Sequence, residues 1–337
     1  MKAVFTKAPY RFEIRDVELR EPGQEEALIK VIACGICGGD VGFAGTDAQD
    51  WQPFGHEVSG IVIKTGANCA NVSAGDKVVL ESGSFCRECE LCRNGRVDLC
   101  NKGPNFWNST SMGFAEYMIA PKECLVPFSG ISFEEAALVE PLGVALDLFY
   151  TAGVQFNDSV LVAGIGPIGL MAIQLSKAAG AKRIYAAAHS HSKARIGLAE
   201  KFGADEIVFT DKTGIESYVY SGGGVDKVML TAPPRLIPAC MKASNLGGTI
   251  AYIGFAGGND AQVTFDANEF HVKKLQLKAS FAAPALYFPR AIELIQRGAV
   301  DVKSLISNRF RLEEIESAMR ALCEDKCNSV KSVMVAE

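Results

Sequence analysis

Residues 160–169 read Val160-Leu161-Val162-Ala163-Gly164-Ile165-Gly166-Pro167-Ile168-Gly169, which sets a G-x-G-x-x-G pattern between an apolar run and a helix-like run. In such a pattern the first glycine permits a tight turn, the second lets the backbone approach a pyrophosphate, and the third lets helix and strand pack closely. A phosphate is favoured there because free N–H groups and the helix dipole meet at the helix N-terminus. The sequence therefore predicts a dinucleotide-binding loop made by Gly164, Gly166, Pro167, Ile168 and Gly169.

The segment around and after this loop alternates between strands and helices. The predicted helices are Ile168–Ala179 and Lys193–Phe202. The predicted strands are Ser159–Ala163, Arg183–Ala188, Glu206–Phe209, Val225–Leu230, Thr249–Ile253 and Leu275–Ser280. This alternation predicts an α/β fold with a doubly wound parallel sheet.

Residues 1–150 have a different rhythm, in which Gly, Pro and Asp separate short β-type runs. The predicted strands here are Ala27–Ile32, Val58–Ile63, Lys77–Leu80 and Ala115–Ile119. They indicate a compact, β-rich domain. The end of the chain holds two amphipathic helices, and in the second of them apolar residues recur at helical spacing, namely Leu312, Ile315, Met319 and Leu322.

The composition is that of a globular protein with a small-molecule substrate. Of the 337 residues 48% are hydrophobic and 22% charged, and the net charge of −5 offers no basic surface for nucleic acid or an acidic membrane. The N-terminus lacks an apolar signal-peptide core, and the most apolar stretch, Val160–Leu175, is broken by glycines and Pro167. We therefore expect a cytoplasmic protein with no nucleic-acid or membrane partner. The 11 cysteines are clustered, which favours metal binding over a secreted disulfide framework.

Four of the cysteines follow the pattern Cys86-x2-Cys89-x2-Cys92-x7-Cys100, which is the most specific signal in the chain. Four thiolates so close together can complete a tetrahedral site around one Zn²⁺ with no open position, as in structural zinc sites. An iron–sulfur cluster also uses four thiolates, but the charged residues between these cysteines give no sign of an electron-transfer partner. The lobe of residues 86–100 is therefore predicted to hold a structural zinc.

The end of the second strand of the parallel sheet bears on the choice between NAD(H) and NADP(H). An acidic residue there would bind the ribose 2′-hydroxyl, but residues 188–195 read AHSHSKAR and contain no acid. The small Ser190 leaves room, and His191, Lys193 and Arg195 are positioned in sequence to contact a 2′-phosphate. We therefore expect NADP(H) to be favoured over NAD(H). The alternative is that these are ordinary basic residues at the start of a helix.

Further metal-type residues lie in three separate fragments: CGICGGD from Cys34 to Asp40, His56-Glu57, and Glu140 before Pro141. Each alone has an ordinary structural explanation as a buried cysteine, a core histidine or an acid at a helix start. Together they supply sulfur, nitrogen and oxygen ligands for a zinc that keeps one position open. Asp40 is well placed to orient His56.

These motifs occur in the order GICGGD, GHE, the cysteine lobe, GFAEY, VEPLGV and the glycine loop. In this order the chain resembles the zinc-dependent branch of the medium-chain dehydrogenase/reductase superfamily, and within it sorbitol and other polyol dehydrogenases. The resemblance implies a GroES-like β-rich catalytic domain formed by residues 1–150 and 285–337. A Rossmann NAD(P)-binding domain, residues 151–284, is then inserted between these two segments.

The resemblance also implies the ligands of the catalytic zinc. Cys37, His56 and either Glu57 or Glu140 hold this zinc, and Cys34 is a neighbour rather than a ligand. Glu140 points to the polyol and threonine dehydrogenases, because the liver alcohol dehydrogenase type is expected to have cysteine at this position.

The function implied is a zinc alcohol dehydrogenase with two zincs per chain. It would transfer hydride between NAD(P) and a secondary alcohol of a polyol, sugar acid or sugar phosphate. The alternatives are a threonine dehydrogenase-like or simple secondary-alcohol enzyme and, in a different class, a zinc-free quinone or enone reductase or a binding protein. Relatives are often dimers or tetramers, so a homodimer or homotetramer is expected.

Two positions depart from the family pattern. Gly39 stands where the family usually has a Ser or Thr that relays the substrate proton, so the relay must run through water, Glu57, Glu140 or another hydroxyl. The stretch Phe281-Ala282-Ala283-Pro284 carries no arginine, whereas sorbitol dehydrogenases contact the polyol chain with one. This weakens a literal sorbitol assignment. Phe43, Trp51 and Phe281 are candidates for a more apolar pocket.

Overall fold

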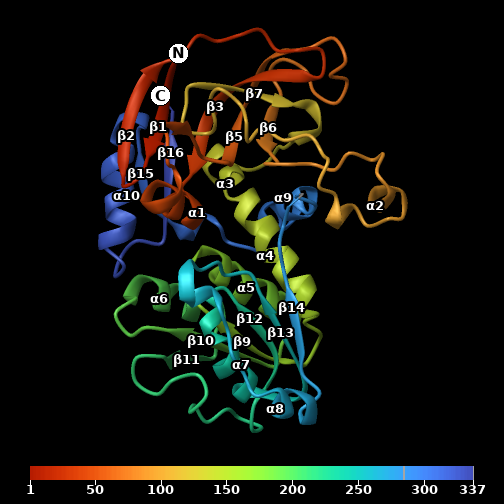
Figure 1. Ribbon diagram of the computed structural model, residues 1–337, viewed down its shortest axis with the longest axis vertical. Helices are drawn as coiled ribbons and strands as arrows, with labels where there is room; N and C mark the ends of the chain where they lie inside the picture. The colour runs from red at the N-terminus through yellow and green to blue at the C-terminus, as the bar shows by residue number, and fades with distance from the viewer. Residues whose placement is uncertain (284, 337) are drawn as a thin grey trace.

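The computed structural model describes residues 1–283 and 285–336, and Figure 1 shows two lobes, one above the other. The lower lobe contains the strands of the central segment of the chain. The upper lobe combines the red to yellow N-terminal strands with strands from the blue end of the chain. Residue 284, the last residue of the predicted NAD(P)-binding domain, and residue 337 lie outside the described residues.

The lower lobe is built on a six-stranded sheet in the order β11-β10-β9-β12-β13-β14, and every neighbouring pair is parallel. Its strands are β9 (Ser159–Ala163), β10 (Arg183–Ala188), β11 (Glu206–Phe209), β12 (Val225–Leu230), β13 (Ser244–Tyr252) and β14 (Gln276–Ala279). This confirms the predicted doubly wound parallel sheet. The strand order reverses between β9 and β12, and sheets of this kind bind ligands at the carboxyl ends of the strands beside such a reversal.

The helices of the lower lobe are α5 (Pro167–Ala178), α6 (Lys193–Lys201), α7 (Ile237–Ala243) and α8 (Ala267–Val272). α5 begins directly after the glycine turn, because Gly166 is extended and Pro167 suits the first helical turn. A Cβ built on Gly169 would lie 2.0 Å from the carbonyl oxygen of Gly164. α5 can therefore pack this closely only because position 169 has no side chain. β13 begins at Ser244 rather than at the predicted Thr249, since Ser244 pairs with Val225 before an irregularity in the ladder.

The upper lobe contains a seven-stranded sheet in the order β15-β16-β3-β5-β6-β8, with β7 also paired to β3, and a small sheet in the order β2-β1-β4. Its strands are β1 (Lys2–Lys7), β2 (Arg11–Asp16), β3 (Glu26–Gly35), β4 (Gln52–Pro53), β5 (Glu57–Thr65), β6 (Lys77–Leu80), β7 (Tyr117–Pro121), β8 (Leu125–Pro127), β15 (Ile306–Phe310) and β16 (Lys331–Val335). β16 pairs with β3, so the end of the chain completes the N-terminal sheet. β7 begins at Tyr117 instead of the predicted Ala115, because Ala115 forms only an isolated bridge to Ala3.

The helices of the upper lobe are α1 (Gly38–Gly42), α2 (Glu90–Arg93), α3 (Phe133–Ala137), α9 (Phe288–Gln296) and α10 (Ile315–Glu324). α9 and α10 are the two predicted amphipathic helices. Leu312 was expected inside the second of them but lies in a short 3-10 turn before it, where Arg311 and Glu314 form a capping box. None of the described helices is long and apolar enough to cross a membrane.

Helix α4 (Val139–Ala152) runs between the two lobes (Figure 1). Leu142 and Leu146 on this helix are almost completely buried in one apolar cluster, which also contains Val79 of β6 and Val160 of β9. α4 ends at Gly153, which has the left-handed conformation that favours glycine (φ 65°). The two sheets are therefore held together by a shared core around α4, whose first turn contains Glu140.

The Gly169→Ala substitution is expected to destabilise the protein by about 1–3 kcal/mol, because the new methyl group would overlap a backbone oxygen that cannot move freely. Gly166→Ala is the matched control, since a Cβ at Gly166 meets no atom within 4 Å. The control should change the free energy of unfolding by less than about 0.5 kcal/mol. Urea denaturation of the three proteins tests this, and equal stabilities would contradict the packing argument.

Candidate active site

Cys37 lies where strand β3 gives way to the short helix α1. Its backbone N–H donates to Asp40 Oδ2 at 2.9 Å, and its Sγ accepts from the Gly39 N–H at 3.3 Å. These reciprocal bonds form a capping box in which Cys37 is the N-cap and Asp40 the third helical residue. The spacing Cys37-x-x-Asp40 therefore fixes the position of the thiol through the local helix start.

His56 comes from the loop before β5 and faces the same carboxylate. Its Nδ1 lies 3.4 Å from Asp40 Oδ1, and Asp40 is only 4% exposed. A histidine whose Nδ1 faces a carboxylate presents Nε2 to a metal, because the carboxylate fixes the orientation of the ring. Sulfur, nitrogen and oxygen atoms of Cys37, His56 and Glu57 all lie within 4.8 Å of one another. The structure therefore brings together three of the predicted zinc ligands.

Glu57 is also bonded to a residue that the sequence analysis did not identify. Lys331, on the last strand β16, donates to Glu57 Oε1 at 2.5 Å and to the carbonyl of Ile36 at 2.7 Å. The Lys331 and Glu57 side chains are 4% and 1% exposed. A Cβ on the neighbouring Gly35 would lie 2.0 Å from Glu57 Oε2, so glycine is required beside this ion pair.

Glu140 approaches the site from the first turn of α4 but is not part of the three-donor group. Burial raises the pKa of Glu140 to about 7, and the nearby His56 acts in the opposite direction. Cys34 is fully buried in β3, outside the group, as a neighbour would be. Glu57 thus belongs to the three-donor group, whereas Glu140 lies outside it and interacts with His56 and Glu57 through its charge.

The three-donor group has the chemistry of a zinc site. Burial lowers the pKa of His56, but Asp40 and Cys37 more than offset this and hold it well above its ordinary value, so the group attracts positive charge. Glu57 Oε2 is buried and accepts no directed hydrogen bond, although Lys331 Nζ lies 2.5 Å away. Such an oxygen, beside a thiol and an imidazole, suits a borderline cation such as Zn²⁺.

The cysteine lobe also fits a zinc ion. The sulfurs of Cys86, Cys89, Cys92 and Cys100 lie within 4.8 Å of one another, and Cys86 Sγ is 3.9 Å from Cys92 Sγ. Two sulfurs bound to one tetrahedral zinc at about 2.3 Å would be about 3.8 Å apart. The backbone N–H groups of Cys89 and Glu88 lower the pKa of Cys86 to about 6, which favours its thiolate. The four cysteines therefore form a ligand set that fits one tetrahedral zinc ion.

The glycine loop has the shape that a pyrophosphate requires. Gly164 has φ 103°, and a Cβ on it would lie 2.7 Å from Thr231 Oγ1. A Cβ on Gly166, by contrast, would meet nothing within 4 Å. The backbone at Gly166 is therefore open at the start of α5, beside Pro167, and Ile168 and Gly169 continue into the helix. This open approach at a helix N-terminus fits a bound phosphate.

The basic residues predicted to contact a 2′-phosphate differ in their exposure to solvent. His191 and Lys193 are exposed after β10, while Arg195 is half-buried and its Nε donates to the carbonyl of Ser329 at 3.2 Å. Ser190 is bonded to a residue that the sequence analysis missed, Asp211, which follows β11. Asp211 reaches Ser190 because β10 pairs with β11, so residues 188–195 alone could not predict this contact.

An aromatic residue that the sequence analysis also missed lies beside His56. The ring of Trp107 is 5.3 Å from that of His56, and Trp107 is 50% exposed. Among the predicted pocket aromatics, Trp51 instead packs under Arg15, and Phe281 contacts Phe255 at the surface. A Cβ on Gly39 would meet only Cys37 Sγ, at 3.6 Å.

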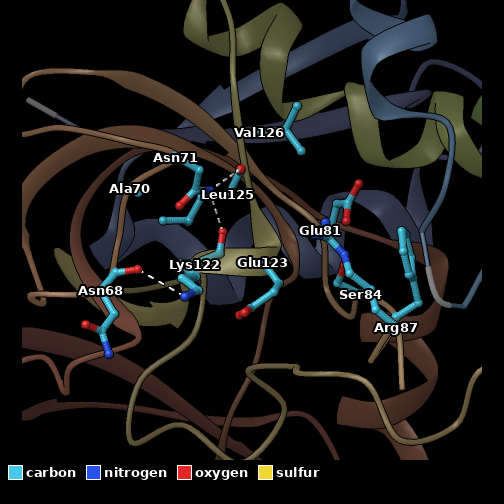
Figure 2. Close-up of a pocket in the computed structure, with 11 residues that line it drawn as sticks. Asn68, Ala70, Asn71, Glu81, Ser84, Arg87, Lys122, Glu123, Leu125 and Val126 are labelled. Carbon is cyan, nitrogen blue, oxygen red and sulfur yellow. Dashed lines mark hydrogen bonds between the residues drawn. The ribbon is translucent and has the colours of Figure 1, made fainter. Parts of the chain in front are cut away.

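A pocket of about 370 Å³ lies beside the cysteine lobe (Figure 2). Figure 2 shows Lys122, which donates to the Asn68 carbonyl at 3.0 Å, on one side and Glu81, Ser84 and Arg87 on the other. Burial raises the pKa of Glu81 to about 8, while the Ser84 hydroxyl lowers it. Its lining contains none of the predicted site residues, so the pocket is separate from the candidate active site.

Comparisons with known proteins agree with this geometry. Residues 23–130 match the alcohol dehydrogenase GroES-like domain, and residues 167–297 match the zinc-binding dehydrogenase domain. Sorbitol dehydrogenase of Bacillus subtilis is 30% identical over 99% of this chain and 97% of its own. D-arabitol-phosphate dehydrogenase of Enterococcus avium is 29% identical over 96% and 95%.

A solved structure shows the same architecture along the whole chain. The crystal structure of 2R,3R-butanediol dehydrogenase from Bacillus subtilis superposes with a TM-score of 0.87 at 26% identity, covering 100% of this chain and 99% of that one. The predicted fold class and family resemblance are thereby confirmed. The chain belongs to the medium-chain family of zinc-binding dehydrogenases and is an NAD(P)-dependent oxidoreductase.

Proposed function

We propose that this enzyme oxidises a secondary alcohol of a polyol, sugar acid or sugar phosphate, or reduces the corresponding ketone, with a catalytic zinc and NAD(P). The observation that carries the proposal is the group of Cys37, His56 and Glu57, whose donor atoms lie within 4.8 Å of one another. The similarity to enzymes named for sorbitol and for D-arabitol phosphate supports the substrate class. A zinc-free quinone or enone reductase would have no use for this ligand set.

The residues of the site have distinct roles in this proposal. Cys37, His56 and one carboxylate would hold the zinc, and Glu57 is the carboxylate that belongs to the three-donor group. Asp40 positions two of these ligands at once, through the Cys37 backbone and the His56 ring. When bound, the zinc supplies Lewis acidity that lowers the pKa of the alcohol, and the nicotinamide supplies the hydride acceptor.

The remaining residues shape the substrate side. Trp107 offers an apolar wall next to His56, which suits the carbon chain of the substrate. Gly39 brings no hydroxyl near Cys37, so the substrate proton must leave through water, Glu57, Glu140 or a hydroxyl of the substrate itself. A polyol carries such neighbouring hydroxyls, which is consistent with the proposed substrate class.

We also propose a second, structural zinc in the cysteine lobe, and thus two zincs per chain. The proposed division into a catalytic domain, residues 1–150 and 285–337, and an NAD(P)-binding domain, residues 151–284, is supported by the way the strands divide between the two large sheets.

A homodimer or homotetramer is supported by the open edge strand β14 and the 64% exposed Phe281 beyond it. A cytoplasmic location is supported by 11 free cysteines.

The cofactor proposal extends to the glycine loop and to the turn after β10. Gly164, Gly166, Pro167, Ile168 and Gly169 would bind the pyrophosphate of either nicotinamide cofactor. The sequence-based preference for NADP(H) relies on His191 and Lys193, whereas the Asp211 carboxylate at Ser190 acts in the opposite direction. The preference between NADP(H) and NAD(H) therefore depends on whether the attraction of a 2′-phosphate to His191 and Lys193 exceeds its repulsion by Asp211.

Metal analysis tests the two-zinc proposal. The purified wild type is expected to contain two zincs per chain, and both His56→Asn and Cys89→Ser are expected to retain one. His56→Asn should lose at least about 100-fold in turnover, and its melting temperature should fall less than that of Cys89→Ser, in which the lobe loses its crosslink. Cys323→Ser, outside both clusters, is the control and should keep both ions. Only one zinc in the wild type, or turnover that survives chelation, would contradict the proposal.

Lys331→Met tests the link between Lys331 and the metal ligand Glu57. In zinc-free protein the substitution leaves a buried carboxylate without a counter-charge, and we expect a loss of about 3–5 kcal/mol in the free energy of unfolding. The loss should be clearly smaller in zinc-loaded protein, because the ion then neutralises Glu57. Lys303→Met, at an exposed position, serves as the control. Equal losses with and without zinc would show that Glu57 does not contact the ion.

A substrate panel tests the alcohol class. Sorbitol, arabitol, their phosphates, sugar acids, L-threonine, butanediol and simple secondary alcohols would be compared by kcat/KM with NAD and NADP. We expect the highest kcat/KM values among polyols, sugar acids or sugar phosphates. The carbon chain of such a substrate would pack against Trp107. A clear preference for L-threonine or for a simple alcohol would replace the proposed class with one of the two alternatives.

A further inference from the structure

Asp211 and Ser190 meet because strands β10 and β11 run side by side in a parallel register. Ala188, the last residue of β10, lies opposite Phe209, the last residue of β11, and the Thr210 N–H donates to the Ala188 carbonyl at 3.0 Å. Two residues beyond each strand end, Ser190 therefore lies beside Asp211. Both are at the carboxyl edge of the sheet, where an adenosine ribose binds in folds of this class.

The Asp211 carboxylate uses both of its oxygens on Ser190. Oδ1 accepts from the Ser190 N–H at 2.8 Å and Oδ2 from its hydroxyl at 2.6 Å. These bonds lower the pKa of Asp211 to about 2, so the carboxylate is ionised at neutral pH. The two donors of Ser190 that a 2′-phosphate would need are thus already engaged by a negative charge.

Three other backbone donors of this turn are also occupied. Ser192 N–H donates to the His189 carbonyl at 3.0 Å, and Lys193 N–H donates to the His191 carbonyl at 2.9 Å. The Ala194 N–H, at the start of α6, donates to the Cys327 carbonyl of the C-terminal segment at 3.0 Å. An anion that used the N–H groups of Ser190, Ser192, Lys193 or Ala194 would therefore have to displace existing hydrogen bonds.

The cations near the turn only partly favour a phosphate. Arg195 is engaged by the Ser329 carbonyl, and Lys212 lies over the ring of Phe209, with Nζ 4.8 Å from its centre. His189 Nδ1 lies 4.0 Å from Asp211 Oδ1, on the side of the carboxylate. His191 and Lys193 remain as exposed side chains, which interact weakly with a solvated phosphate.

We propose that Asp211 is a specificity-determining residue that makes this enzyme prefer NAD(H) over NADP(H). This inference rests on the proposed function, because it assumes that a nicotinamide cofactor occupies the glycine loop. Each carboxylate oxygen has a second lone pair, so Asp211 can accept a hydrogen bond from a ribose 2′-hydroxyl while it holds Ser190. A 2′-phosphate at the same point would meet the carboxylate as a like charge.

Asp211 would thus perform the task that an acid at the end of β10 performs in related folds. The acid is supplied from the neighbouring strand instead, two residues after β11. Residues 188–195 then need no acid of their own, and the basic residues around Ser190 do not by themselves select the phosphorylated cofactor.

Direct binding measurements test this inference. Dissociation constants for NADH and NADPH would be measured on the full-length zinc-loaded protein by cofactor fluorescence, and those for 5′-ADP and 2′,5′-ADP by calorimetry. We expect the wild type to bind NADH at least 10-fold more tightly than NADPH. Asp211→Asn should reduce this ratio by 10-fold or more, mainly through tighter NADPH binding, and the two ADP fragments should follow the same trend.

Asp205→Asn is the matched control, because Asp205 also accepts from a backbone N–H, that of Ile184 at 2.8 Å, but at the opposite end of the same strand pair. It removes one charge and should leave the NADH/NADPH ratio unchanged. A wild type that prefers NADPH, or a ratio that Asp211→Asn does not alter, overturns the inference and leaves the proposed function intact. If neither NADH nor NADPH binds, the proposed function fails and the inference fails with it.

Discussion

A buried ion pair between Glu57 on β5 and Lys331 on β16 connects the two ends of the chain beside the metal ligands. Because both side chains are almost completely buried, neither charge is tolerable without the other or without a metal. Lys331 also holds the Ile36 carbonyl, one residue before Cys37. The position of Cys37, the proposed zinc ligand, therefore depends on strand β16, which pairs with β3 in the N-terminal sheet.

Helix α4 is the second feature that determines how the two lobes are held together. Its apolar residues belong to one core that reaches from β6 in the upper lobe to β9 in the lower lobe. Its first turn contains Glu140, which interacts through its charge with His56 and Glu57, two of the proposed zinc ligands. Large relative movement of the lobes would expose this shared core, which costs about 25 cal/mol for each Å² of apolar surface. The shared core around α4 therefore opposes separation of the two lobes.

The features that the sequence predicted correctly depend on residues close together in the chain. The glycine turn and the cysteine lobe each form a local structure whose geometry follows from the residue types, and the parallel sheet follows from its apolar runs. Lys331 and Asp211 could not be identified in this way, since each acts through a partner on a distant segment or a neighbouring strand. Trp107 was missed because nothing in its local sequence distinguishes a site residue from a surface aromatic.

The turn after β10 lies next to the carboxyl end of the neighbouring strand β11. A rule that inspects only the residues after the second strand assumes that the ribose contacts come from that strand. In a parallel sheet the carboxyl ends of adjacent strands lie side by side, so a carboxylate two residues after β11 reaches the same point as one on the turn after β10. A 2′-phosphate at this turn would therefore interact with charged residues from the ends of both strands. One of them is the Asp211 carboxylate, which binds Ser190 through both of its oxygens.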